Sequence, residues 1–283
     1  MLRLISLLLG LLLLGPAAGA SEPARPTRDS LTRDMAARIR EALPGRDVQI
    51  AGPLTLGITG PDGDGPRTVN LDRVWNVCQS SDAVSCEASI SNFVAASGEL
   101  VTERPQFTRG QLRVMVRSEE YCVEVRRLYA ERSQTAQTRS LPGELCAVLV
   151  ADAPNTMRLL GADDLNELGL IAAEAWPIAE RQTLANLPDP ASLTFENGLA
   201  VVGGREYVPS LILAADGWRS LAAAQGEILM AVPSDGGLVA FRASDVPDLS
   251  RLGAVVEQEF ANGERGISRH IYRWTAQGWA IAR

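Results

Sequence analysis

The chain has 283 residues, of which 46% are hydrophobic and 22% charged, and its formal net charge is −7. This composition is that of a globular protein with a sizeable core, and the acidic balance argues against nucleic acid as a partner, because non-specific binding needs a cationic surface. The sequence contains no lysine, which excludes Schiff-base and lysine general-base mechanisms.

The first 20 residues have the pattern of a secretory signal peptide. Arg3 precedes an apolar run over residues 4–14, which is followed by a Gly-Pro pair and by Ala18-Gly19-Ala20. The run is shorter than the roughly 20 residues that span a bilayer. We therefore expect a periplasmic or secreted protein with Ser21 as its mature N-terminus and without stable membrane insertion after signal cleavage.

Hydrophobic periodicity and turn residues predict most of the secondary structure in chain order. The predicted helices cover residues 29–43, 82–97, 163–168, 171–187, 217–225 and 245–260, with Pro177 kinking or restarting the fourth of them. The predicted strands cover residues 48–51, 54–58, 112–116, 145–150, 156–160, 193–195, 199–202, 208–213, 227–232, 238–242, 270–275 and 278–281. Residues 68–77 are predicted as a strand or a strand that enters a helix, and residues 118–132 fit neither period.

Helices and antiparallel hairpins alternate without regular βαβ units, which predicts an α+β fold with mixed or antiparallel sheets. After the signal peptide, residues 21–28 carry two prolines and predict a disordered leader. The polar stretch over residues 133–141 predicts a boundary between two lobes, an N-terminal lobe over 29–140 and a C-terminal lobe over 141–283.

The chain has four cysteines, Cys78, Cys86, Cys122 and Cys146. An even number in an exported chain favours two disulfides, for which three connectivities exist. Pairing Cys78 with Cys86 and Cys122 with Cys146 closes the two shortest loops without crossing. A zinc site is the alternative, but no C-x-x-C spacing is present.

Candidate catalytic residues are few. His270 is the only histidine, and no G-x-S-x-G motif accompanies it, so we interpret it as an ordinary strand residue. Asp62 and Asp64 resemble a fragment of a calcium loop without the required later ligands, which indicates a polar loop tip. Carboxylates are plentiful, for example Glu119-Glu120 and the Glu257 and Glu259 pair, but no pair is singled out for general acid–base work.

Other patterns also have simple structural interpretations. The Asp163-Asp164 pair begins a short helix, where negative charge suits the helix dipole. Trp274 and Trp279 flank the last turn and either pack in the core or form a platform for a carbohydrate or peptide. No G-x-G-x-x-G or Walker pattern is present, so we expect no cofactor.

Five short motifs occur in order in the second half of the chain. They are Thr156-Met157-Arg158-Leu159, Asp164-Leu165, Leu184-Ala185-Asn186-Leu187, Asp216-Gly217-Trp218-Arg219-Ser220-Leu221 and Met230-Ala231-Val232-Pro233-Ser234-Asp235. In this order, over about residues 145–283, the chain resembles the uncharacterised bacterial family typified by YtpQ. That family often has Arg where this chain has Ser234, and its typical members are cytoplasmic. The resemblance implies no activity and no catalytic residues.

The absence of a nucleophile–base pair and of a metal-ligand pattern favours a non-enzymatic binding or assembly factor, with a sheet face or an interlobe groove for an unknown protein or small-molecule partner. A periplasmic hydrolase that uses carboxylates on cell-wall or glycan substrates is the alternative. A small-molecule-binding pair of lobes is a third hypothesis. An unpaired sheet edge or an exposed apolar patch would favour the first hypothesis, and carboxylates clustered in a deep cleft would favour the second.

Overall fold

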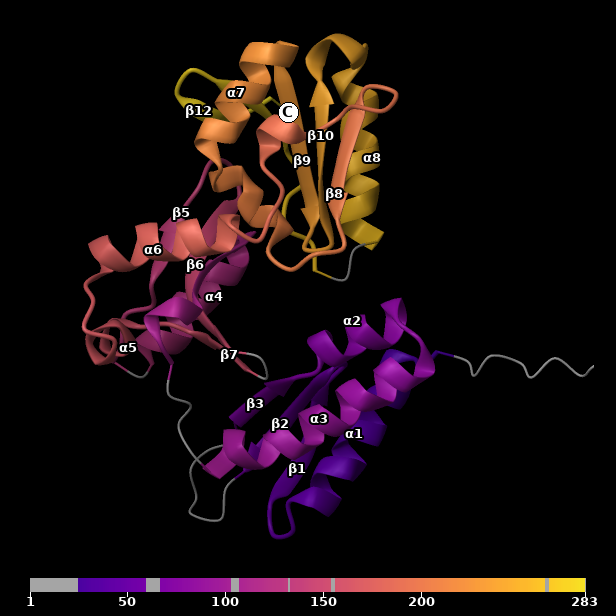
Figure 1. Ribbon diagram of the computed structural model, residues 1–283, viewed down its shortest axis with the longest axis vertical. Helices are drawn as coiled ribbons and strands as arrows, with labels where there is room; N and C mark the ends of the chain where they lie inside the picture. The colour runs from indigo at the N-terminus through magenta and orange to yellow at the C-terminus, as the bar shows by residue number, and fades with distance from the viewer. Residues whose placement is uncertain are drawn as a thin grey trace, which may run out of the picture. The chain divides into compact units, whose positions relative to one another are not determined.

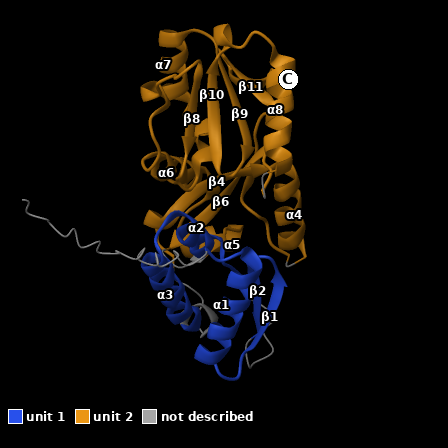
Figure 2. Ribbon diagram, turned by 90° about the vertical axis from the view of Figure 1, so that its right-hand side faces the viewer, with its two compact units in different colours: residues 1–104 blue, residues 105–283 orange. Residues whose placement is uncertain are grey.

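The computed structural model describes residues 25–59, 67–102, 107–131, 133–153, 156–262 and 265–282, and it shows an α+β fold. The chain divides into two compact units, residues 1–104 and 105–283 (Figure 2). The first 24 residues, with the expected signal peptide, and the loop that contains Asp62 and Asp64 lie outside the described residues.

The first unit is built from a three-stranded antiparallel sheet and three helices. Its elements are α1 (Arg28–Ala42), β1 (Asp47–Gly52), β2 (Thr55–Thr59), β3 (Arg67–Asn70), α2 (Asp72–Ser80) and α3 (Ala83–Thr102), and the strand order is β1-β2-β3 (Figure 1). The expected apolar stripe of α1, with Leu31, Met35 and Ile39, is buried against Leu56 and Ile58 of β2. The four-residue spacing of that stripe therefore predicted the packing face correctly.

Part of the expected leader is ordered. The Arg25 guanidinium donates to the carbonyl of Gln79, and the Gln79 side chain donates to the carbonyl of Pro26 at 3.1 Å. Thr27, rather than Asp29 or Ser30, caps α1, since its hydroxyl accepts from the Ser30 amide at 3.2 Å. Residues 25–28 therefore belong to the first unit, because contacts with α2 and the helix cap hold them.

The second unit contains a four-stranded sheet that is centred on β6. Its strands are β4 (Leu112–Ser118), β5 (Thr138–Ser140), β6 (Leu145–Ala153) and β7 (Thr156–Leu159), in the order β4-β6-β5 with β7 also paired to β6. The 3₁₀ turn η1 (Arg109–Gln111) precedes β4, and helix α4 (Glu119–Ala130) lies between β4 and β5. The expected central strand is confirmed, since residues 145–151 are buried on both faces.

A five-stranded antiparallel sheet completes the second unit. Its strand order is β12-β11-β9-β10-β8, and every neighbouring pair is antiparallel. The strands are β8 (Leu199–Gly203), β9 (Ile228–Ser234), β10 (Gly237–Arg242), β11 (Ile271–Thr275) and β12 (Gly278–Ile281). The other elements are α5 (Ala162–Glu167), α6 (Ala172–Leu184), η2 (Pro190–Ser192), η3 (Val208–Leu213), α7 (Ala215–Gln225), η4 (Ala243–Asp245) and α8 (Leu249–Asn262).

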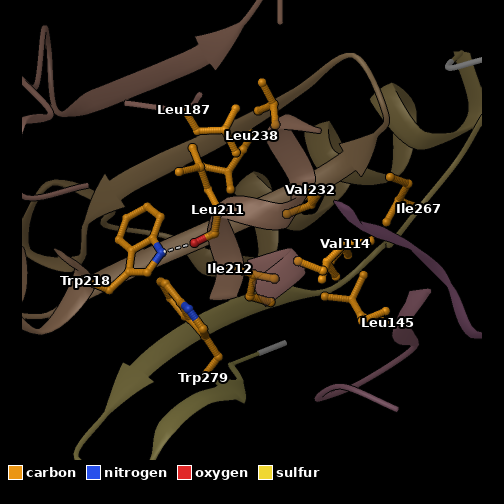
Figure 3. Packing of buried hydrophobic residues seen from close by; sticks show 14 of the residues in the cluster. Val114, Leu145, Leu187, Leu211, Ile212, Trp218, Val232, Leu238, Ile267 and Trp279 are labelled. Carbon is orange, nitrogen blue, oxygen red and sulfur yellow. Dashed lines mark hydrogen bonds between the residues drawn. The ribbon is translucent and has the colours of Figure 1, made fainter. Parts of the chain in front are cut away.

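One hydrophobic core joins both sheets of the second unit (Figure 3). It brings Val114 and Leu145 from the first sheet together with Val232 and Leu238 from the second. Trp218 of α7 is fully buried there, and its indole donates to the carbonyl of Leu211 at 2.6 Å. Because this core takes residues from both sides of residues 133–141, the structure places the division of the chain at residue 104 instead of the expected stretch.

Two expected strands do not form. Residues 208–213 are the 3₁₀ helix η3, in which Pro209 supplies a fixed φ near the start and removes one ladder donor. Residues 193–195 lie next to the Asn197-Gly198 turn, but only one bridge, Glu196 to Leu199, crosses it. The turn itself has the left-handed backbone expected of Asn-Gly, while β8 pairs with β10.

Candidate functional site

Strand β8 lies at the edge of the five-stranded sheet. It pairs with β10 on one side, and no other strand of the described residues pairs with its opposite side. Figure 2 shows this sheet with β8 on the side away from α8. An unpaired edge offers a row of backbone N–H and C=O groups to an incoming strand.

The side chains of β8 alternate between the core and the surface. Ala200 and Val202 are buried in the core of the second unit, at 4% and 6% exposure. Leu199 and Val201 point to the other face and are 38% and 66% exposed. The sequence of this strand, Leu-Ala-Val-Val-Gly, is apolar on both faces, so β8 combines an open backbone edge with exposed apolar side chains.

Helix α8 covers only part of the sheet face to which Val201 belongs. Leu229 and Ala231 of β9 are 1% exposed, and they pack with Val256 of α8 in one buried cluster. Moving outward from Ala231, the directly opposed residue of β10 is Val239, which is half-buried, and the next is Val201. The exposure of the side chains on this face therefore increases from β9 through β10 to β8. We call Leu199, Val201, Val239 and the half-buried Phe241, which is paired with Leu199, the β8 margin.

The outer edge of β4, in the other sheet, shows how this fold closes a strand edge. The buried hydroxyl of Thr183 accepts from the Val114 amide at 2.8 Å, and the buried hydroxyl of Ser210 accepts from the Val116 amide at 3.2 Å. Ser210 also donates to the carbonyl of Val114 at 2.9 Å. No side chain of the described residues makes a corresponding bond along residues 199–203. The β4 edge is sealed by side chains. At the β8 edge the amide and carbonyl of Leu199 bond to Glu196, at 3.2 and 2.9 Å, and the edge is open beyond that residue.

The edge also lacks the usual devices that discourage strand addition. Proline, lysine and inward-pointing charges commonly protect exposed edges, and residues 199–203 contain none of them. A charge pair lies at the end of β10, where Arg242 Nε and Asp245 Oδ2 are 2.6 Å apart. The β8 margin is thus an apolar strand edge beside a small polar rim.

The four cysteines lie in two disulfides, in the pairing that gives the shortest loops. Cys78 and Cys86 join α2 to α3 across a Cα–Cα distance of 4.4 Å, and Cys122 and Cys146 join α4 to β6 across 6.4 Å. Each disulfide lies within one unit and is buried. With all four sulfurs in disulfides, no thiolate is left for the zinc alternative.

His270 lies beside a buried polar network. The Ser268 hydroxyl is 2.7 Å from the Tyr272 hydroxyl and donates to Glu144 Oε1 at 3.1 Å. The backbone N–H of His270, not its imidazole, donates to Ser268 Oγ, and the two rings of His270 and Tyr272 meet edge to face at 6.3 Å. Burial raises the pKa of Tyr272 to about 12. Since Ser268 and Tyr272 are fully buried, this network links β11 to the start of β6 and does not present a nucleophile.

The tryptophans of the last turn and the acidic pair at the start of α5 have structural roles. Trp279 packs edge to face against both Trp218 and Trp274, with ring centroids 5.1 and 5.2 Å apart, which agrees with core packing rather than a platform. Asp164 is buried, accepts from the Gly161 amide at 2.7 Å and pairs with Arg158, so it caps α5 as the dipole argument predicted.

Several exposed carboxyl groups have a lowered pKa. Hydrogen bonds from Ser85, Arg38 and Arg127 lower the pKa of Asp82, Glu87 and Glu124 respectively. A general acid needs a raised pKa, so these three carboxyls do not suit the hydrolase alternative. The described residues hold no cluster of three or more metal-ligating side chains, and within them no helix is both long and apolar enough to cross a membrane.

Comparison of the chain with protein-family models, with curated proteins and with solved structures finds no match. The resemblance to the YtpQ family therefore stays a prediction. Nothing in the sequence singles out Leu199 and Val201, although the Asn197-Gly198 turn predicts a strand over residues 199–202. The missing signal was the strand order, which decides that β8 has only one neighbour.

Proposed function

We propose that this chain is an exported, non-enzymatic binding or assembly factor that holds an extended segment of a partner protein against β8. The observation that carries the proposal is the β8 edge, which is open beyond Leu199 and carries two exposed apolar side chains, Leu199 and Val201. In strand addition, backbone hydrogen bonds supply the affinity and alternate side chains supply the specificity. The partner segment would therefore be extended, with apolar side chains at every second position to meet the β8 margin.

Export is the second part of the proposal. The first 20 residues have a charged start, an apolar run and an A-x-A-like end, and two disulfides suit an oxidising compartment. N-terminal sequencing of the protein from a periplasmic or secreted fraction should begin at Ser21. Retention of Met1 in a cytoplasmic fraction would contradict export.

The binding role is tested by photo-crosslinking from two valines of the second unit. A benzophenone side chain at position 201 should form discrete adducts in the producing cells, while the same group at position 255 should not. Val255 lies on α8 and is 52% exposed, so the control has similar chemistry and accessibility. Mass spectrometry of the adducts should map the contact to one short segment of the partner. Equal labelling at both positions would contradict a specific role of the β8 margin.

A further inference from the structure

Arg117 is a largely buried cation whose counter-charge lies beyond hydrogen-bond distance. It is the last residue but one of β4, and its side chain is only 17% exposed. Its Nη1 donates to the carbonyl of Val116 at 3.1 Å, and its Nη2 lies 3.9 Å from Asp235 Oδ2, beyond hydrogen-bond distance. Burial lowers the pKa of the guanidinium, which nonetheless stays charged because its ordinary pKa is so high. A further anion that accepts a hydrogen bond from the Arg117 guanidinium would stabilise this buried charge.

The carboxylate nearest to Arg117 is shared with a second arginine. Asp235 Oδ2 is 3.4 Å from Arg265 Nη1, closer than it is to Arg117. Asp235 lies in the turn between β9 and β10, and its amide donates to the carbonyl of Arg265 at 3.3 Å. Two guanidinium groups thus face one carboxylate, and the carboxylate lies closer to Arg265, the more exposed of the two.

Two tyrosines border the same place. Tyr121, in the first turn of α4, is 37% exposed, and Tyr207 packs beside Met115 and the disulfide between Cys122 and Cys146. Both phenols interact electrostatically with Arg117. Partial burial raises the pKa of Tyr121 while Arg117 and Arg265 oppose that rise, so the phenol is neutral at pH 7 and can donate a hydrogen bond.

We propose that Arg117, with Tyr121 and Arg265 at its margin, is a binding site for an oxyanion group, a carboxylate or a phosphate, of a small ligand. An oxyanion there would accept from the Arg117 fork and from the Tyr121 hydroxyl, and the half-buried ring of Tyr207 would contact the apolar part of the ligand. The site lies on the α4 face of the β4-β6-β5 sheet and shares no residue with the β8 margin.

The test titrates the full mature chain with benzoate and phenyl phosphate at constant ionic strength, with neutral benzamide as the matched control. Isothermal calorimetry and the side-chain NMR signals of arginine report binding. We expect saturable binding of benzoate or phenyl phosphate, and the stronger of the two identifies the oxyanion. Saturable binding of benzamide with similar affinity, or no saturable binding of either anion, would overturn the proposal.

Three variants locate the site. Arg117→Gln should weaken binding by about tenfold or more, whereas Arg219→Gln, which removes the same charge from the exposed side chain paired with Asp216, should leave it unchanged. Asp235→Asn removes the competing carboxylate and should tighten binding several-fold, a result that a merely structural role of Arg117 would not produce. If Arg117→Gln does not fold, Asp235→Asn decides alone: unchanged or weaker binding in that variant would overturn the assignment. Failure of these titrations would leave the crosslinking result at position 201 unaffected.

Discussion

Val201 of β8 lies directly opposite Val239 of β10, yet Val201 is 66% exposed while Ala231, the next residue across the sheet, is 1% exposed. The three residues share one sheet face, and the buried cluster under α8 takes in β9, β11 and Phe241 of β10 but no residue of β8. An apolar strand edge of this kind is costly to leave bare, because it invites unselective pairing. Its presence is what the proposed capture of a partner strand explains.

The register of β8 makes a prediction about two neighbouring valines. Val201→Lys should change the free energy of unfolding by less than about 0.5 kcal/mol, since the side chain is exposed. Val202→Lys should prevent stable folding of the second unit, because Val202 is 6% exposed and belongs to its core. Chemical denaturation of both variants measures the difference. Similar destabilisation by the two substitutions would contradict the alternation of β8.

The disulfides should act on different unfolding transitions. Cys78 and Cys86 are separated by 8 residues, and Cys122 and Cys146 by 24. Loop entropy then predicts losses of about 2.5 and about 3.5 kcal/mol when each pair is replaced by alanine. Because the first pair lies in residues 1–104 and the second in residues 105–283, each double variant should lower only one of two calorimetric transitions. A single transition that both variants lower equally would be inconsistent with two separately folding units.

Ionisation of Tyr272 should lower the stability of the second unit at alkaline pH. Burial, which is the main cause, and the nearby Glu144 raise its pKa to about 12, whereas an unfolded tyrosine titrates near pH 10. The folded state thus favours the neutral phenol, and this contribution is present below pH 10 and is lost as the pH rises through 12. Between pH 10 and 12, the unfolding free energy should fall by about 2–3 kcal/mol more in the unmodified chain than in Tyr272→Phe. Parallel pH profiles would show that the buried phenol does not titrate in this way.

Trp218 should be the most sensitive tryptophan of the second unit. It is fully buried, donates to the carbonyl of Leu211 at 2.6 Å and packs edge to face on Trp279. Trp218→Phe loses the hydrogen bond and part of the ring volume, with an expected cost of about 2–3 kcal/mol. Trp274→Phe, at a half-buried position on β11, should cost less than about 1 kcal/mol. Denaturant titration of both variants makes the comparison, and equal costs would argue against the Trp218 environment described above.

Much of the fold could be predicted from local patterns. The four-residue stripe of Leu31, Met35 and Ile39, the continuous apolar run of residues 145–150 and the hairpin across Pro233–Gly237 each carry a period or a turn signal that tertiary packing did not override. Among the three possible connectivities, short and uncrossed loops favoured the cysteine pairing that the structure has.

Other features depend on contacts between distant residues. The apolar residues 208–213 have the composition of a strand, but Pro209 and packing against β4 favour a 3₁₀ helix. The division of the chain at residue 104 depends on a core shared by both sheets of the second unit. The exposure of Val201 depends on strand order and on the reach of α8, neither of which local periodicity contains.

Backbone hydrogen exchange along residues 199–203 tests the central claim most directly. In the free chain, the amides of β8 that bond neither to β10 nor, as the Leu199 amide does, to Glu196 should exchange quickly, because nothing protects them. In the complex captured through position 201, the fast amides should become slow, while the exchange of α8 stays the same. Partner binding that leaves the fast amides of β8 unprotected would contradict strand addition at this edge.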